Sequence, residues 1–243
     1  MSADEVRPES TPLARSDPWS DLALTLPVFV AYHLGVVFLP VRNAADLVTR
    51  ELTRLANDNL LHYAALTFAI GALFVGVLVV LGRKSELRWQ RFFWIAIEGV
   101  LYALAMRLVA GYVVGKLRLA GPGEVELEAP GLLAAVVLSL GAGFYEEIAF
   151  RVVLFDLGAR VIRLFAEPIP IAQARLITFG WAVISALAFS AWHYVGPLGD
   201  PFELRSFVFR WVCGLVFTVI YVFRGFAPAV WTHLVYDIWV LAF

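Results

Sequence analysis

The most informative part of the sequence is an apolar stretch that holds three charged residues, Gly143-Phe144-Tyr145-Glu146-Glu147-Ile148-Ala149-Phe150-Arg151. It lies inside a run that is long and apolar enough to cross a membrane. A charged side chain at bilayer depth costs several kcal/mol, so it is rare there unless it is paired or functional. The stretch therefore indicates a polar site inside a membrane protein.

The composition supports this interpretation for the chain as a whole. Of its 243 residues, 61% are hydrophobic and 16% are charged, whereas a soluble domain is about 45–50% apolar and about 25% charged. The net charge of -1 gives no reason to expect nucleic acid as a partner. We therefore expect an all-α, polytopic bundle of transmembrane helices whose partners are membrane lipid and a substrate.

Seven segments are candidates for membrane-spanning helices, which need about 20 mostly apolar residues. They cover residues 22–40, 60–81, 92–114, 131–165, 176–195, 207–223 and 227–243. An additional amphipathic helix on the membrane surface is expected over residues 42–59, where leucines recur at helical spacing. The fourth segment is expected to continue as one helix to Phe165, before Pro168 and Pro170 end it.

The third segment carries two charged residues, Glu98 and Arg107. They are nine positions apart, which is too far for a contact along one helix. Each is therefore expected to meet a partner on another helix.

We divide the chain into three parts. Residues 1–20 are polar and are expected to form a disordered tail, residues 21–130 supply three spans, and residues 131–243 form a second membrane domain with four spans. Basic residues favour the cytoplasmic side of a membrane. Their distribution gives weak support to a cytoplasmic amino terminus, and we expect a multi-pass protein of a prokaryotic cytoplasmic membrane.

Helical spacing separates the charges of the opening stretch. Glu147 and Arg151 are four positions apart, so they share one face of a helix and can neutralise each other. Glu146 is turned about 100° away from Glu147, which makes it the better candidate for a reactive carboxylate. The alternative is that all three charges form a structural clamp to a neighbouring helix.

Two histidines on later spans complete the candidate site. Phe189 and His193 are four positions apart, so the aromatic ring can pack beside the imidazole. His193 can equally be an ordinary hydrogen-bonded residue at a helix end. His233 and Asp237 share the same spacing, so Asp237 can accept from one imidazole nitrogen and set the tautomer, or the two can form a helix–helix hydrogen bond.

Two histidines together with carboxylates can activate water in two ways. Glu146, His193 and His233 can hold one divalent metal, zinc first among the candidates, with an open coordination position. Alternatively, Glu146 acts as a general base without a metal. Both routes predict hydrolysis. The sequence contains neither H-E-x-x-H nor G-x-S-x-G, so it lacks the signatures of a zincin helix and of a serine nucleophile elbow.

Three motifs follow one another on separate apolar segments: E-E-x-x-x-R at Glu146, Glu147 and Arg151, F-x-x-x-H at Phe189 and His193, and H-x-x-x-D at His233 and Asp237. In this order they resemble the CPBP family. That family comprises type II CAAX prenyl endopeptidases and bacteriocin-processing or immunity proteins, also called the Abi group. The likeness covers residues 131–239.

The resemblance implies an intramembrane protease that cleaves near the carboxyl end of prenylated proteins or processes small peptides. Its partner would be a peptide or a lipidated protein. It also implies that Glu146 and His193 activate the attacking water, while His233 and Asp237 stabilise the oxyanion. Both the metal-dependent and the metal-free route stay open.

Two positions depart from the pattern of the family. Val152 stands where members often have glycine, and Asp237 stands where many have asparagine. An ionised aspartate cannot donate a hydrogen bond to an oxyanion, whereas asparagine can. Asp237 would therefore be protonated, orient His233 or bind a metal.

The shared site makes a geometric demand. His193 lies at the end of the fifth segment and Glu146 near the middle of the fourth, a mismatch in depth on the order of 10–15 Å. A fourth helix that runs on to Phe165 would remove it, and a shared site requires Glu146 within about 8 Å of both histidines. The alternative to an enzyme is an immunity-like, partner-binding or proton-coupled transport protein that uses the same residues as a buried relay.

Overall fold

The computed structural model describes residues 17–39, 54–56, 59–81, 89–119, 131–165, 170–196 and 199–243. Within these ranges every regular element is a helix, so the expected all-α class is confirmed. The surface helix predicted over residues 42–59 lies almost wholly outside the described residues, and so does the predicted tail up to residue 16.

All seven predicted segments are helical where the structure describes them. Five helices are long and apolar enough to cross a membrane: α1 (Pro18–Phe38), α4 (Gln90–Lys116), the continuous helix Leu132–Phe165, α7 (Ile171–Trp192) and α8 (Leu204–Arg224). Two apolar helices are shorter: the Leu60–Leu73 part of α3 (Leu60–Leu81), and α9 (Phe226–Ala242). Within the described residues, five candidate spans and two shorter apolar helices make the chain a multi-pass membrane protein.

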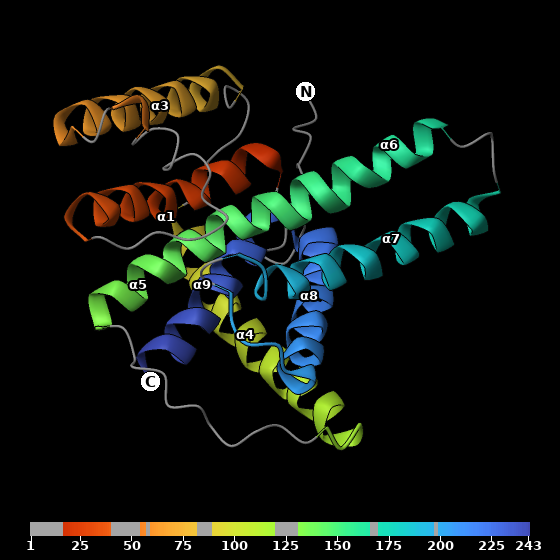
Figure 1. Cartoon of the computed structure of the whole chain (residues 1–243). Helices are drawn as coiled ribbons and strands as arrows, with labels where there is room; N and C mark the ends of the chain where they lie inside the picture. The colour runs from red at the N-terminus through yellow and green to blue at the C-terminus, as the bar shows by residue number, and fades with distance from the viewer. Residues whose placement is uncertain are drawn as a thin grey trace, which may run out of the picture.

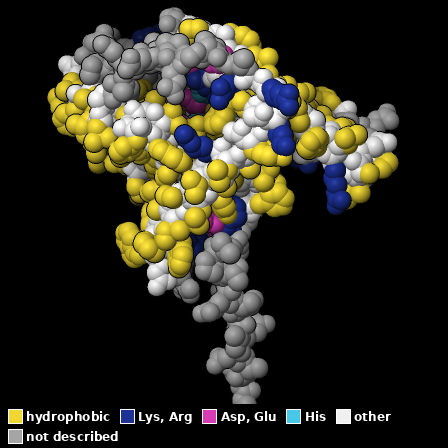
Figure 2. Space-filling view, turned by 90° about the horizontal axis from the view of Figure 1, so that it is seen from below, with side chains coloured by type: hydrophobic (Ala, Val, Ile, Leu, Met, Phe, Trp, Pro, Cys, Tyr) yellow, Lys and Arg dark blue, Asp and Glu magenta, His cyan; other side chains and the backbone are white. Residues whose placement is uncertain are grey.

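Hydrophobic side chains cover much of the outer surface of the bundle, as Figure 2 shows for one face. Phe68 on α3, Leu108 on α4 and Phe179 on α7 each expose about two thirds or more of their surface, at 79%, 67% and 66%. Contiguous exposure of large apolar side chains marks a surface that meets lipid or another protein. The exposed apolar side chains thus agree with the membrane protein that the composition indicates.

One helix of 34 residues, Leu132–Phe165, crosses the molecule, with α1 and α3 along one side and α7 running back beside its second half (Figure 1). At 1.5 Å per residue it is roughly 50 Å long, which exceeds the thickness of the hydrocarbon core and favours a tilt. The predicted continuation to Phe165 is confirmed.

The long helix is not α-helical throughout. It is built from α5 (Leu132–Gly141), the π-helical segments η1 (Ala142–Glu146) and η2 (Ile148–Leu157), and α6 (Gly158–Phe165). A π-helical turn holds more residues than an α-helical one and often occurs at functional sites. Glu146 and Glu147 lie where η1 meets η2, so the irregular backbone falls on the charged stretch.

The long helix and α9 approach each other closely at Gly143. A Cβ atom at this position would lie 2.9 Å from the carbonyl oxygen of Val230 and 3.1 Å from the backbone nitrogen of Leu234. These are backbone atoms that cannot move aside, so the contact requires glycine. This approach brings α9, with His233, against the charged stretch.

The start of α9 is fixed by α1. Gly225 has a φ of 109°, which favours glycine, and gives α9 no side-chain cap of its own. The carboxylate of Asp21 on α1 instead accepts hydrogen bonds from the backbone N–H groups of Phe226, at 2.9 Å, and Ala227, at 3.0 Å. It satisfies two of the free N–H groups at the helix end and complements the helix dipole.

α1 itself begins at Asp17, whose carboxylate accepts from the backbone N–H of Ser20 at 3.0 Å and from its hydroxyl at 2.7 Å. Arg91 on α4 donates to the same hydroxyl at 2.7 Å. Partial burial acts to raise the pKa of Asp17, but the hydrogen bonds from Ser20 and the charge of Arg91 outweigh it, so the pKa lies below its ordinary value.

Glu98 and Arg107 on α4 both meet partners on other helices, as expected. Glu98 accepts from Arg224 on α8 at 2.7 Å and 3.0 Å. Arg107 places its guanidinium 4.6 Å from the centre of the Trp239 ring on α9. These contacts tie α4 to the carboxyl-terminal helices.

Candidate active site

Glu147 is the centre of a fully buried charge cluster. Its Oε1 atom lies 3.1 Å from Nη1 of Arg151, the contact predicted from the spacing, and accepts a hydrogen bond from Nδ1 of His233 at 2.7 Å. The three residues expose between 0% and 3% of their surface. A buried carboxylate is tolerable when it is paired and hydrogen-bonded, and Glu147 meets both conditions.

Aromatic rings hold Arg151 in place. Its guanidinium lies 4.3 Å from the centre of the Phe189 ring on α7 and 4.9 Å from the centre of the Phe217 ring on α8. Nη2 also donates to the carbonyl oxygen of Gly214 at 3.5 Å. A cation that is desolvated between aromatic faces gains substantial attraction, so the cluster joins the long helix to α7, α8 and α9.

Glu146 points to a different set of partners. Its Oε2 atom lies 3.9 Å from Nε2 of His193 and 3.9 Å from Nε2 of His233. The geometric demand of a shared site, Glu146 within about 8 Å of both histidines, is met. The long helix continues to Phe165, and its backbone is π-helical at Glu146.

Each imidazole is oriented by its Nδ1 atom. Nδ1 of His193 lies 3.0 Å from the carbonyl oxygen of Phe189, to which it donates when it carries the proton, and the Phe189 ring packs edge-on at 5.1 Å. Nδ1 of His233 faces Glu147, and its ring stacks on Phe217 at 4.5 Å. Both partners are acceptors, so both Nε2 atoms are directed to Glu146.

Asp237 lies beside His233, but it does not hold the imidazole as expected. Its Oδ2 atom is 3.5 Å from Nε2 of His233, longer than an ordinary hydrogen bond. The expectation that Asp237 sets the tautomer is corrected, because Glu147 takes that place at Nδ1. Asp237 instead borders the same space as Glu146.

The spacing of Glu146, His193 and His233 differs from that of a metal site. Two ligands of one zinc ion, each about 2.0–2.1 Å from it at a tetrahedral angle, lie about 3.3–3.4 Å apart. The observed separations of 3.9 Å are wider, and in the part of the chain that the structure describes no three His, Cys, Asp or Glu side chains are arranged to hold a metal. As placed, the donors do not fit a metal.

The same spacing suits one water molecule. Two atoms 3.9 Å apart can both lie about 2.8 Å from a water placed between them. One side of the cluster is also open: the side chain of His193 is 25% exposed and that of Asp237 is 21% exposed, whereas Glu147 is sealed. A substrate can therefore approach from the side of Glu146.

A second buried polar group next to the site was not foreseen. Nε2 of His33 on α1 lies 2.7 Å from the hydroxyl of Tyr145, and Nδ1 lies 3.0 Å from the hydroxyl of Tyr63 on α3. Tyr145 precedes Glu146 in the chain. The only signal in the sequence was a histidine inside an apolar segment, which does not by itself name a partner.

Residues 128–239 match a family model described as Rce1-like: Type II CAAX prenyl endopeptidase Rce1-like. This part of the chain is similar to the Rce1-like family. The resemblance to CAAX proteases is thereby confirmed, and the match indicates a membrane protease that acts on a peptide or protein. The matched residues contain the whole cluster from Glu146 to Asp237. No curated protein and no solved structure matches the chain.

Proposed function

We propose that this protein is an intramembrane endopeptidase that cleaves near the carboxyl end of prenylated, CAAX-type substrates with Glu146 as the general base. The observation that carries the proposal is the position of one carboxylate oxygen of Glu146, 3.9 Å from Nε2 of both His193 and His233. The match of residues 128–239 to the CAAX endopeptidase model supports the substrate class.

In the proposed reaction a water molecule lies between Glu146 and the histidines. Glu146 takes its proton as the oxygen attacks the carbonyl carbon of the scissile bond, and His193 orients the water through Nε2. The proton on Glu146 then passes to the departing amine as the carbon–nitrogen bond breaks. Because Glu146 is largely buried, its charge acts in a lower dielectric than that of water.

The developing oxyanion needs a hydrogen-bond donor. His233 supplies one from Nε2 when both of its nitrogens carry a proton, a state that Glu147 at Nδ1 and Asp237 near Nε2 favour by their negative charge. Arg151 offsets the charge of Glu147. Asp237 is assigned the role of a partner of His233 rather than that of an oxyanion donor.

Cleavage of a prenylated CAAX-type peptide by the purified protein in bilayers tests the proposal. The wild-type protein is expected to release the carboxyl-terminal fragment, and Glu146→Ala is expected to release none. Asp156→Asn is the matched control, since Asp156 is a carboxylate of the same long helix that pairs with Arg160 outside the cluster. Equal turnover by wild type and Glu146→Ala would reject Glu146 as the base.

A divalent metal at Glu146, His193 and His233, zinc first, is the alternative route to the same reaction. Metal analysis of the purified protein and cleavage after treatment with a chelator separate the two routes. We expect less than one metal per chain and unchanged turnover after chelation. One metal per chain, lost in both Glu146→Ala and His193→Ala, would assign a metal to the site.

The non-enzymatic alternative is a partner-binding, immunity-like or proton-coupled transport role for the same residues. It predicts no cleavage of any peptide and a phenotype in cells that survives Glu146→Ala. We further propose that the protein lies in a prokaryotic cytoplasmic membrane with a cytoplasmic amino terminus. Labelling of a cysteine added before residue 17 by a membrane-impermeant reagent, in whole and in broken cells, tests that orientation.

A further inference from the structure

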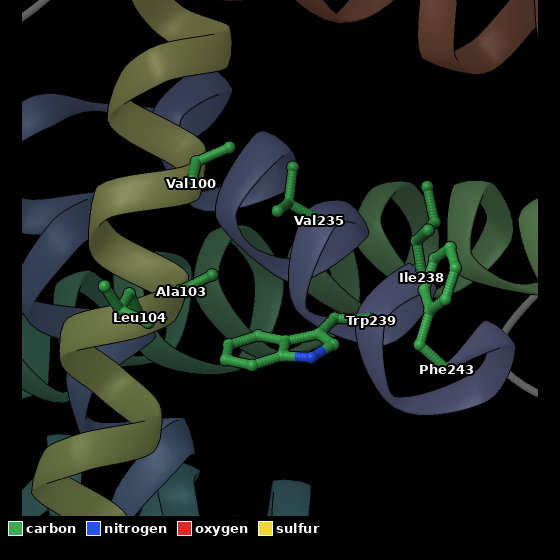
Figure 3. A pocket seen from close by; sticks show the side chains of 7 residues that line it. All are labelled: Val100, Ala103, Leu104, Val235, Ile238, Trp239 and Phe243. Atoms are coloured by element: carbon green, nitrogen blue, oxygen red, sulfur yellow. The ribbon is translucent and has the colours of Figure 1, made fainter.

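An apolar groove of about 400 Å³ lies between α4 and α9 (Figure 3). In Figure 3 the indole of Trp239 extends from α9 into the space between the two helices. The side chains that line the groove are Val100, Ala103, Leu104, Val235, Ile238, Trp239 and Phe243. The volume falls within the range of small-molecule sites, about 300–1,000 Å³.

The groove is separate from the candidate active site. Val235 and Trp239 each follow a residue of the cluster, His233 and Asp237, by two positions. Two positions correspond to a rotation of about 200° around a helix, so the groove lies on the opposite side of α9 from the cluster. No residue of the cluster lines it.

One end of the groove carries a positive charge. Val100, Ala103, Leu104 and Arg107 follow one face of α4 at the spacing i, i+3, i+4 and i+7. The exposed guanidinium of Arg107 lies 4.6 Å from the centre of the Trp239 ring, which itself lines the groove. Arg107 takes part in none of the ion pairs formed by the described residues.

An exposed cation inside a span needs an anion or a route to the membrane surface. Arg107 lies nine positions before Lys116, the last residue of α4, or about 14 Å along the axis, a distance that a long side chain shortens by extending to the interface. Tryptophan, the residue type of Trp239, is enriched at the membrane–water interface. A guanidinium that extends to the interface meets lipid phosphates, which it binds with two hydrogen bonds.

We propose that the groove between α4 and α9 binds an anionic phospholipid of the surrounding bilayer. Its phosphate lies on the guanidinium of Arg107, and one acyl chain follows the apolar lining from Leu104 and Trp239 towards Val100. The lipid packs against the back of the helix that carries His233 and Asp237. This site does not depend on the proposed peptidase activity, and its test measures binding alone.

The test is retention of lipid by the purified full-length protein, measured by native mass spectrometry after exposure to phosphatidylglycerol or phosphatidylcholine. The wild-type protein is expected to retain phosphatidylglycerol in preference to phosphatidylcholine. Arg107→Gln is expected to lower the retention of phosphatidylglycerol about fivefold, which corresponds to ~1 kcal/mol per basic residue near an anionic surface. It is expected to lower that of phosphatidylcholine less, because the choline of this lipid offsets the charge of its phosphate.

Two matched controls isolate the site. Arg163→Gln removes another exposed arginine, on α6, that does not line this groove, and is expected to change nothing. Val100→Phe fills the groove from a position that is 53% exposed and is expected to reduce retention of both lipids, whereas Val109→Phe, on the opposite face of α4, is not.

Three results would overturn the proposal. One is equal loss of phosphatidylglycerol in Arg107→Gln and Arg163→Gln, which would indicate general attraction to a basic surface. Another is unchanged retention of both lipids in Val100→Phe, since it would place no acyl chain in the groove. The third is displacement of the lipid by millimolar glycerol 3-phosphate, because the site would then recognise a free anion.

Discussion

Two buried histidines lie on either side of the same charged stretch, and they differ in their partners. His33 is 1% exposed, and each ring nitrogen lies within hydrogen-bond distance of a tyrosine hydroxyl, Tyr145 at 2.7 Å and Tyr63 at 3.0 Å. His233 is 3% exposed and faces carboxylates: Glu147 at 2.7 Å from Nδ1, and Asp237 and Glu146 at 3.5 Å and 3.9 Å from Nε2.

The comparison shows that burial alone does not mark a reactive histidine. Hydroxyls at both nitrogens satisfy His33 as a neutral ring, since one hydroxyl can donate and the other can accept. His233 is satisfied at Nδ1 only, and the longer distances at Nε2 leave room for a water or a substrate atom. The first arrangement joins α1, α3 and the long helix, and the second can carry out chemistry.

The largest effect is expected from a change at Glu146, which faces His233. Glu146→Gln keeps the shape of the side chain but removes the general base, a contribution of typically 10²–10⁴-fold in rate. We expect a fall in turnover of at least about 10²-fold with an unchanged midpoint of thermal unfolding. Turnover of a prenylated peptide and unfolding of the same preparation measure the two quantities; a large loss of stability would instead assign Glu146 to the fold.

The next effect separates Glu147 from Glu146. Arg151→Met removes the arginine paired with buried Glu147 and leaves it only the contact with His233, and removal of one partner from a buried pair costs about 3–5 kcal/mol. We expect a loss of that size in the free energy of unfolding, measured by reversible denaturation in mixed micelles. A variant that is as stable as wild type but inactive would contradict the division into a structural and a reactive carboxylate.

A smaller effect is expected at the other histidine. His33→Phe fills the space of the imidazole but removes its hydrogen bonds to two tyrosine hydroxyls, and a typical hydrogen bond contributes about 0.5–1.5 kcal/mol to stability. We expect lower stability with normal turnover per folded molecule. Tyr63→Phe is the milder companion change, because the neighbouring contact to Tyr145 stays. Loss of turnover in folded His33→Phe would show that His33 and its two tyrosine partners influence Glu146.

The smallest effect is expected at Asp237. Asp237→Asn introduces the residue common among CAAX proteases, removes one negative charge near Nε2 of His233 and adds a donor for the oxyanion. Because the two changes oppose each other, we expect turnover within about tenfold of wild type, or ~1.4 kcal/mol. Steady-state cleavage measures it, and a loss as large as that of Glu146→Gln would make Asp237 a second base.

The helices and the side-chain pairs within each helix could be predicted because both depend on local sequence. Apolar runs of about 20 residues identify the spans, and the spacing of four positions brings Glu147 to Arg151 and Phe189 to His193. The order of the three motifs also led to the family of CAAX proteases, which the match to residues 128–239 supports.

Other features depend on how distant helices pack, and no local pattern contains them. The approach of α9 to Gly143 brings Nδ1 of His233 to Glu147, whereas the sequence offered only Asp237, four positions away, as one possible partner. The cap of α9 comes from Asp21, about 205 positions earlier. The π-helical turns at Glu146 have no reliable signature in a single sequence.

The central claim, that Glu146 and the two Nε2 atoms share one activated water, is tested most directly by an experimental structure at a resolution that shows ordered water, with anomalous scattering recorded at the zinc edge. The account predicts a water about 2.8 Å from Oε2 of Glu146 and from Nε2 of His193 and His233, without an anomalous peak. An anomalous peak about 2.0–2.1 Å from these three atoms, or a direct hydrogen bond from Glu146 to an imidazole that leaves no room for water, would contradict it.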